Sequence, residues 1–367
     1  MANHYFFTGF PGFISINLIK QLIKGNSDVG KISLLVLPTM KTKAQEELTQ
    51  LKEELNMGES GPKFELILGD ITKPNLNIET ETNKQLIDSV RYVFHLAAIY
   101  DLAVPKKLAY EVNVKGTANV NQWVKSLKNL KRYVYFSTAY VAGKRQGPIL
   151  ETELDKKQEF KNHYEHTKYE AEVLVEQLKE SVPLTIIRPG VVVGHSNSGE
   201  TTKFDGPYFL LNFFDRLRFS PIIPYLGKGE AEGNFVPINY IIDATIYLSH
   251  SDKGIGKTYH LTDSNPYQMK DIYRMMLERL LNRKPLGTIP LLFAKVFLSF
   301  SIIRKWLKVE KEALDYFTFK SEFDATHSKL DLEGSGIACP DFKNVIDAIV
   351  PYYEQHKHDE QKHIEIR

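Results

Sequence analysis

Tyr164 and Lys168 stand four residues apart in the run Tyr164-Glu165-His166-Thr167-Lys168. On a helix this spacing places both side chains on one face, one turn apart. A phenol beside an ammonium suits general acid–base work, because the cation favours phenolate and lowers the pKa of the tyrosine toward neutral pH. We interpret the pair as a candidate acid–base centre for hydride chemistry, although a chain with 19 tyrosines can also produce this spacing by chance.

Thr138 supplies a third candidate group. It follows the apolar run of residues 131–137, which we interpret as a strand that ends at Ser137. A hydroxyl at the end of such a strand could polarise a carbonyl oxygen in front of the tyrosine. The alternative is that Ser137 and Thr138 only satisfy local backbone groups.

A glycine turn near the N-terminus is the candidate cofactor site. An apolar strand ending at Thr8 runs into Gly9 and Gly12 and then into a helix over residues 14–24. In a dinucleotide site the first glycine permits a tight turn, the second lets the backbone approach a pyrophosphate, and the helix start offers unpaired N–H groups. Ser15 stands where a third glycine is usual. The turn alone also fits a purely structural role.

The secondary-structure elements around these groups determine their positions. Along the chain, short apolar runs alternate with amphipathic helical stretches. The predicted strands are residues 5–8, 31–37, 64–70, 92–96, 131–137 and 184–188, and the predicted helices are residues 14–24, 41–56, 83–89, 105–127 and 164–179. This alternation predicts an α/β fold, a Rossmann-type doubly wound parallel sheet with helices on both faces. Ligands of such sheets bind beyond the carboxyl ends of the strands, where the candidate groups lie.

The residues after the second strand indicate which nucleotide is preferred. An acid there would accept the ribose hydroxyls of NAD and repel the extra phosphate of NADP. The chain instead has Lys41 and Lys43, with no acid before Glu46. We predict NADP(H) in preference to NAD(H), with both lysines near the phosphate, unless they only form a solvated first helical turn. Asp70, after the third strand, could contact the adenine amine.

Composition limits the other classes of function. The 367 residues are 43% hydrophobic, and the formal net charge of +2 comes without a basic block, so nucleic acid is not an indicated partner. Cys339 is the only cysteine, which excludes an intramolecular disulfide and fits a reducing compartment. We expect no metal site. The apolar run of residues 289–303 is too short to span a bilayer and contains Lys295, and the N-terminus lacks a basic leader, so we expect a cytoplasmic protein.

Seven motifs resemble, in order and in interval, those of the extended short-chain dehydrogenase/reductase family. They are Thr8-Gly9-x-x-Gly12-Phe13-Ile14, Gly69-Asp70, His95-Leu96-Ala97-Ala98, Asn113-Val114-Lys115-Gly116-Thr117, Ser137-Thr138, Tyr164-x-x-x-Lys168 and Arg188-Pro189-Gly190. Within that family, the runs 94–102 and 136–143 look like the branch of thioester reductases and fatty acyl-CoA reductases. The resemblance is closest over residues 1–250.

The resemblance implies a function for each matching position. Thr138 would polarise the substrate carbonyl, Tyr164 would donate the proton, and Lys168 would hold the nicotinamide ribose. The implied cofactor-binding residues are Gly9, Pro11, Gly12, Phe13 and Ile14 along the pyrophosphate, Asp70 and Ile71 at adenine, Ala97 and Ala98 at the adjoining ribose, and Pro189, Gly190 and Val191 at the nicotinamide. The residues expected to contact the substrate are Tyr100, Tyr140, Phe204 and Tyr208.

Family members build their substrate lobe from two separate segments. We therefore predict an NADP-binding domain from residues 1–194 with 234–262, a mostly helical substrate lobe from residues 195–233 with 263–355, and a disordered tail from residue 356 to 367. Dense aromatic residues near 204–214 suit either a long acyl chain or an ordinary core. The apolar helix near residues 291–300 could pack in the core, line a tunnel, form a homodimer or contact a membrane surface.

Together these features predict an NADPH-dependent reductase whose substrate is an acyl thioester, on CoA or on an acyl carrier protein, or a long-chain aldehyde. One alternative is an extended-family enzyme for a nucleotide-sugar or a hydroxysteroid-type substrate. Another is a non-catalytic dinucleotide-binding regulator. The joint presence of Thr138, Tyr164 and Lys168 favours an enzyme over a regulator.

Overall fold

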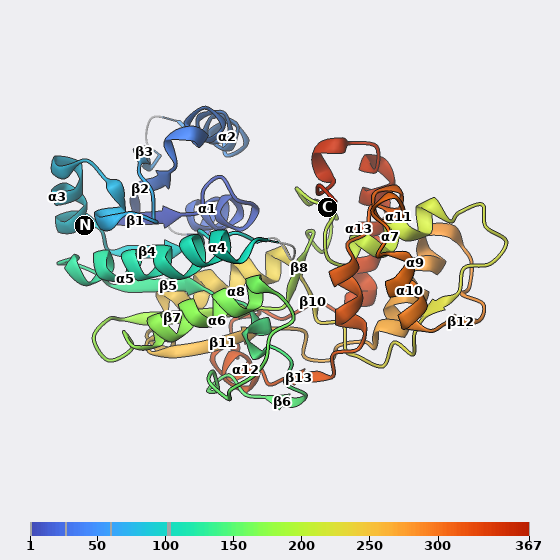
Figure 1. Cartoon of the computed structure of the whole chain (residues 1–367). Coiled ribbons are helices and arrows are strands. Elements are labelled where there is room, and N and C mark those ends of the chain that lie inside the picture. The colour runs from blue at the N-terminus through green and yellow to red at the C-terminus, as the bar shows by residue number, and fades with distance from the viewer. Residues whose placement is uncertain (1, 26–27, 59–60, 101–103, 367) are drawn as a thin grey trace.

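Seven parallel strands form the central sheet of the protein (Figure 1). The structure, a computed structural model, describes residues 2–25, 28–58, 61–100 and 104–366. The strands are β1 (Asn3–Thr8), β2 (Val29–Val36), β3 (Lys63–Leu68), β4 (Tyr92–His95), β5 (Arg132–Phe136), β7 (Leu184–Pro189) and β11 (Lys257–Leu261). Their order is β11-β7-β5-β4-β1-β2-β3, and every neighbouring pair is parallel. The Rossmann-type sheet predicted from the sequence is confirmed.

The strand order reverses beside β1. The chain proceeds outward from β1 to β2 and β3, and then returns to β4 on the other side of β1. Loops that leave two such strands diverge and open a crevice at their carboxyl ends, which is where ligands of open α/β sheets bind. Here the crevice is lined by Thr8 and Gly9 after β1 and by Leu96 and Ala97 after β4.

Helices cover both faces of this sheet. Those on one face are α1 (Phe13–Gly25), α2 (Lys41–Glu54) and α8 (Ile238–His250), and those on the other are α3 (Thr80–Ser89), α5 (Gly116–Ser126) and α6 (His163–Glu176). Side chains alternate along a strand, so Tyr5 and Phe7 join the first core while Phe6 joins the second. A strand that is buried on both faces is apolar throughout, which explains why the sequence located it.

The helix predicted over residues 105–127 is interrupted. A short α4 (Lys106–Ala109) and the longer α5 are joined by a π-helical turn, Tyr110–Lys115. Widened turns of this kind occur frequently at functional sites. This one carries Asn113, whose side chain is buried. The spacing of apolar residues does not reveal the one extra residue of a π-helical turn, so the sequence predicted a continuous helix.

A mainly helical lobe lies beyond the sheet, on the right of Figure 1. Its helices are α7 (Tyr208–Arg216), α9 (Met269–Leu281), α10 (Leu291–Phe297), α11 (Ser301–Leu307) and α13 (Phe342–His356). Two short parallel pairs accompany them, β8 (Val191–Val193) with β10 (Phe235–Pro237), and β9 (Tyr225–Leu226) with β12 (Thr288–Ile289). The lobe has its own core, in which Phe214, Tyr273 and Ile346 are buried.

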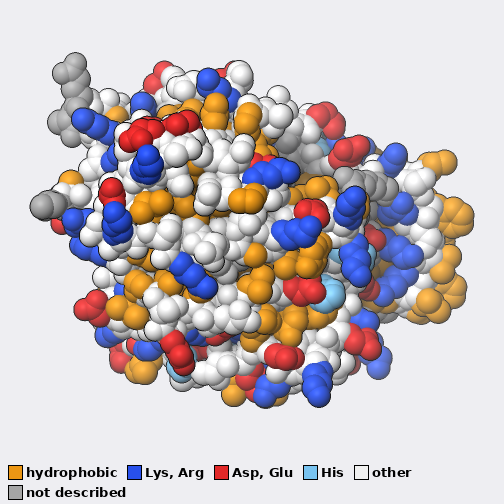
Figure 2. All heavy atoms as spheres, turned by 60° about the vertical axis from the view of Figure 1, so that its left-hand side comes forward, with side chains coloured by type: hydrophobic (Ala, Val, Ile, Leu, Met, Phe, Trp, Pro, Cys, Tyr) orange, Lys and Arg blue, Asp and Glu red, His pale blue; other side chains and the backbone are white. Residues whose placement is uncertain are grey.

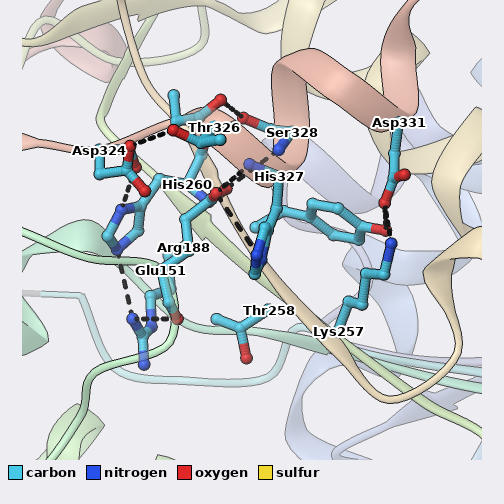
Figure 3. Close-up of polar contacts among 12 residues, drawn as sticks. Glu151, Arg188, Lys257, Thr258, His260, Asp324, Thr326, His327, Ser328 and Asp331 are labelled. Atoms are coloured by element: carbon cyan, nitrogen blue, oxygen red, sulfur yellow. Dashed lines mark hydrogen bonds and ion pairs between the residues drawn. The ribbon is translucent and has the colours of Figure 1, made fainter.

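One stretch of the predicted lobe segment 263–355 packs on the sheet instead. Strand β13 (Ser321–Phe323) pairs with β6 (Gly147–Ile149), and α12 (Thr326–Leu332) contacts β11. Figure 3 shows how polar contacts fasten it: the buried carboxylate of Glu151 accepts backbone N–H bonds from His260 at 2.9 Å and from Ser328 at 3.2 Å. Asp331 of α12 also pairs with Lys257 of β11 at 2.6 Å.

The tail that we expected to be disordered is folded against the lobe. The carbonyl oxygen of Lys362 accepts a hydrogen bond from the backbone N–H of Phe204 at 2.7 Å, and its ammonium donates to the Tyr352 hydroxyl at 2.9 Å. Ile364 packs on the lobe core, and Ile366 is buried in it. The many charged residues of the tail suggested disorder, but two isoleucines two positions apart give an extended segment one apolar side.

Candidate active site

The turn after β1 has glycines at the positions where the backbone of a dinucleotide site must approach the cofactor closely. Gly9 has a φ of +88°, and a Cβ atom placed there would lie 2.8 Å from the backbone nitrogen of Ala97. A Cβ atom on Gly12 would lie 2.7 Å from the carbonyl oxygen of Gly9. Both positions therefore need glycine, and together they form a cradle at the N-terminus of α1, where N–H groups and the helix dipole favour a pyrophosphate. The residues present fit a nicotinamide dinucleotide.

Ser15 tightens this turn rather than loosening it. Its hydroxyl lies 3.1 Å from the carbonyl oxygen of Gly9 and 2.8 Å from that of Gly12, and its side chain is buried. The third glycine of the usual motif permits close packing of the helix on the strand. Here a small side chain permits the same approach and adds a hydrogen bond across the turn.

Nearly all of the residues predicted to bind the cofactor line one continuous crevice. They are Gly9, Pro11, Gly12, Phe13, Ile14, Lys43, Asp70, Ile71, Ala97, Ala98, Tyr164, Lys168, Pro189, Gly190 and Val191. Lys41 does not line it, because it stands exposed at the first position of α2, whereas Lys43, two positions further round the helix, faces the crevice. In the run 94–102, residues 101 and 102 lie outside the described residues.

Thr138, Tyr164 and Lys168 come together at the carboxyl end of β5. All three are buried and line the crevice, and the hydroxyl of Thr138 lies beside that of Tyr164. Thr138 is held in place because its oxygen accepts a bond from the backbone N–H of Tyr140 at 3.3 Å. The structure thus brings the three candidate groups together at one point of the crevice.

The N-terminus of α6 fixes where Tyr164 stands. Asn162 caps this helix, since its side-chain oxygen accepts the backbone N–H of Glu165 at 2.9 Å. Tyr164 is therefore in the first turn, and Lys168 follows one turn later on the same face. The ring of Tyr164 also meets that of Tyr100 edge to face, with centroids 5.1 Å apart.

The expected lowering of the tyrosine pKa is wrong. Burial raises the pKa of Tyr164, and the charge of Glu165 adds to this, while the neighbouring hydroxyl of Thr138 opposes it. Lys168 does not counter the effect, because its ammonium donates to the carbonyl oxygen of Phe136 at 2.6 Å and to the hydroxyl of Tyr135 at 3.0 Å. Burial also lowers the pKa of Lys168 to about 7. Tyr164 is thus a neutral phenol at pH 7, the form that can donate a proton.

Three buried polar residues that the sequence did not assign to the site hold the catalytic groups in position. Asn113, on the π-helical turn, accepts the backbone N–H of Ile99 at 2.9 Å and donates to the hydroxyl of Thr167 at 3.0 Å, next to Lys168. Glu172, one turn after Lys168 on α6, accepts a hydrogen bond from Ser137 and another from Nε of Arg188 at 2.8 Å. The signal was present in the motifs that contain Asn113 and Arg188, but neither spacing nor composition indicated their contacts.

The crevice continues into the helical lobe as one cavity of about 1730 Å³. Beyond Tyr164, its walls are mostly apolar. The lobe residues that contribute apolar side chains are Phe209, Leu210, Phe213, Leu217, Leu226, Ile289, Phe297, Leu298, Ile303, Trp306, Leu307, Val309, Leu314 and Phe317. No arginine lines the cavity within the part of the chain that the structure describes. Its size and lining suit a long apolar ligand.

Two of the four residues expected to contact substrate lie elsewhere. Tyr100 and Tyr140 line the cavity next to Tyr164, as expected. Phe204 and Tyr208 do not, because both are fully buried in the lobe core, where the ring of Phe204 meets that of Tyr353. The helical period of α7 explains the position of Tyr208, since Phe209, Leu210 and Phe213 take the cavity face and Tyr208 takes the core face.

Known proteins are similar to this chain in sequence. The family model described as "Male sterility protein" matches residues 7–245, which is more than half of the chain. A non-canonical nonribosomal peptide synthetase, cpsA of Aspergillus campestris, is 27% identical over 290 residues, covering 74% of this chain and 27% of its own length. The fatty acyl-CoA reductase wat of Drosophila melanogaster is 24% identical over 277 residues, covering 66% of this chain and 53% of its own length.

The fold is also that of a solved reductase domain. The terminal R domain from the myxalamid PKS-NRPS biosynthetic pathway superposes with a TM-score of 0.79 at 22% identity, covering 97% of this chain and 91% of that one. The chain spans about half the length of the fatty acyl-CoA reductase above and about a quarter of the peptide synthetase. With the family match over residues 7–245, these findings show that the chain belongs to the male sterility protein family of NAD-binding proteins, whose cofactor is a nicotinamide dinucleotide.

Proposed function

We propose that this chain is a reductase that uses NADPH to deliver hydride to the carbonyl carbon of an acyl thioester or of a long-chain aldehyde. The observation that carries the proposal is the meeting of the Thr138 and Tyr164 hydroxyls where the dinucleotide crevice opens into an apolar cavity. The similarity to a fatty acyl-CoA reductase supports the acyl thioester as a substrate class.

Each residue then has a distinct task. The turn at Gly9 and Gly12 binds the pyrophosphate, and the bound dinucleotide supplies hydride from its nicotinamide ring. Thr138 and Tyr164 donate hydrogen bonds to the carbonyl oxygen as negative charge develops there, and they are in position beforehand, so little reorganisation is needed. Tyr164 gives its proton to that oxygen. An aldehyde becomes an alcohol, whereas a thioester becomes a hemithioacetal that releases its thiol and leaves an aldehyde.

The apolar lining favours this proposal over a nucleotide-sugar substrate. A nucleotide diphosphate would need cationic side chains around its phosphates, and no arginine lines the described part of the substrate cavity. The cations that do line its lobe half are Lys203 and Lys362, and the ammonium of Lys362 is already bound to Tyr352. A fatty chain gains about 0.8 kcal/mol for each methylene that it buries there.

A substrate panel tests the proposal directly. We expect NADPH oxidation with acyl-CoA thioesters or with fatty aldehydes of increasing chain length, and none with nucleotide-sugars. Turnover of nucleotide-sugars alone would replace the proposed substrate class. Tight NADPH binding without turnover of any substrate would instead support a regulator. Cytoplasmic location and a homodimer stay predictions of the sequence.

NADPH is expected to bind more tightly than NADH, and Lys43→Ala should narrow that difference about tenfold. A hydrogen bond from an ammonium to a phosphate contributes roughly 1.5–3 kcal/mol, of which an exposed side chain realises the lower part. Lys43 lines the crevice beside Leu37 and Met40, after β2. Titration of both nucleotides, followed by protein fluorescence, measures the difference.

Lys41→Ala is the matched control, because Lys41 starts the same helix but does not line the crevice. It should leave the ratio of the two dissociation constants unchanged. Tighter binding of NADH by the unmutated protein would refute the interpretation of this region.

A further inference from the structure

Helices α10 and α11 expose an unusual amount of apolar surface. Seven large side chains on this helix pair are each between 51% and 82% exposed. They are Leu292, Phe293, Val296, Phe297, Phe300, Ile302 and Trp306, and we call them the apolar face. Single exposed apolar residues are ordinary, but a continuous group on one helical hairpin is a feature of interaction sites.

The charged residues of the segment that carries this face all have one sign. Residues 283–309 contain six lysines and arginines and no acid. Lys295 and Lys308 are paired with Asp315 and Glu360 from other segments. Lys284 and Lys305 have no ion pair with any residue that the structure describes, and both are exposed. Figure 2 shows hydrophobic side chains beside Lys and Arg at the right-hand end of the molecule, the side on which Figure 1 places the lobe.

The apolar face also adjoins the far end of the cavity. Phe297 and Trp306 are more than half exposed to solvent and at the same time line the cavity. Ile289 and Ile303 line the cavity beside them. An apolar chain that enters between these side chains would therefore reach the cavity without crossing a polar surface.

We propose that the apolar face is a docking surface for an anionic phospholipid bilayer, through which a long-chain substrate passes directly into the cavity. The helices would lie in the plane of the interface, with Phe, Leu and Ile among the acyl chains, Trp306 at the level of the headgroups and the lysines on anionic lipids. No helix of the described residues is long and apolar enough to cross a bilayer, so the contact is peripheral. The route for substrate rests on the proposed reductase function, but the binding does not.

Charge favours this occupant over a second copy of the chain. In a symmetric dimer the same patch faces itself, so Lys284 and Lys305, which have no ion pair with any described residue, would face the same positive charges on the second copy. A bilayer with anionic lipids supplies the complementary charge and an apolar phase for seven large side chains. Lysines and arginines near such a surface strengthen binding to it.

Cosedimentation with vesicles tests the proposal. The full chain should sediment with vesicles of phosphatidylcholine and phosphatidylserine, less with phosphatidylcholine alone, and less at high salt. The variant Leu292→Ser with Ile302→Ser should lower the partition coefficient by at least about tenfold, because both side chains bury apolar surface in the bilayer. Lys284→Glu with Lys305→Glu should remove the preference for phosphatidylserine.

Leu330→Ser is the control, because Leu330 is 60% exposed on α12, which packs on the sheet away from α10 and α11. It should sediment like the unmutated chain. Every variant should keep its turnover of a short, water-soluble aldehyde, since Leu292, Ile302, Lys284 and Lys305 do not line the cavity. If the unmutated chain does not reduce the aldehyde, that result contradicts the proposed reductase function but leaves the proposed membrane binding untouched.

Two results would overturn the docking proposal. The first is an unmutated chain that does not sediment with the mixed vesicles; if the substitutions then abolish self-association or binding of an acylated carrier protein, the apolar face binds that partner instead. The second is a Leu292→Ser, Ile302→Ser variant that still sediments fully.

Discussion

Replacing Tyr164 with phenylalanine is expected to lower kcat by at least about 10²-fold with little change in the dissociation constant of NADPH. The substitution removes one hydroxyl, the only group proposed to give its proton to the carbonyl oxygen. It keeps the ring, which packs edge to face against Tyr100. Because burial raises the pKa of this phenol, the protonated donor is present throughout the neutral range, and the loss should not be recovered by changing pH between 6 and 8.

Tyr208→Phe provides the matched control for that experiment. It also removes one buried tyrosine hydroxyl, which here accepts the backbone N–H of Gly194 at 3.2 Å, but it lies in the lobe core and not in the cavity. Its kcat should stay within about a factor of three of the unmutated value, since the hydroxyl has no contact with the reacting groups. Steady-state kinetics with a fatty aldehyde, together with NADPH titration, measures both variants. Full turnover by Tyr164→Phe would mean that another group is the acid.

The sequence predicted most of the sheet because its inner strands are buried on both faces. Such strands are continuous apolar runs, and the alternating helices between them imply parallel order. The glycine turn and the Tyr164-Lys168 spacing were equally visible, since backbone geometry restricts which residues can stand at Gly9 and helical period fixes which side chains share a face.

What the sequence missed depends on burial and on long-range contacts. The pKa of Tyr164 is raised because the phenol is desolvated, which a spacing of four residues does not reveal. Phe204 and Tyr208 looked like substrate contacts because aromatic density alone does not say which side chains are buried in the core and which line the cavity. The tail looked disordered because its charges outnumber the isoleucines that anchor it. In each case the deciding contact comes from a segment far away in the chain.

The ion pair between Glu172 and Arg188 is the strongest case of such a contact. Both side chains are at most 1% exposed, and Nε of Arg188 lies 2.8 Å from the Glu172 carboxylate. Arg188→Met should lower the free energy of unfolding by about 3–5 kcal/mol, because it leaves a buried carboxylate without its counter-charge. Urea denaturation followed by circular dichroism measures the change. Arg279→Met is the control, since the pair of Arg279 with Asp347 has a similar distance of 2.9 Å but is exposed, and it should cost less than about 1 kcal/mol.

A second substitution identifies the cause of that loss. If the unpaired carboxylate dominates, adding Glu172→Gln to Arg188→Met should restore at least about half of the lost stability, because the buried charge is gone. Arg188 also donates to the carbonyl oxygen of Glu153 at 2.9 Å, so recovery should not be complete. If the double variant is as unstable as the single one, the arginine acts by packing and by its carbonyl contacts. Glu172 would then matter mainly as the acceptor that holds Ser137 next to Thr138.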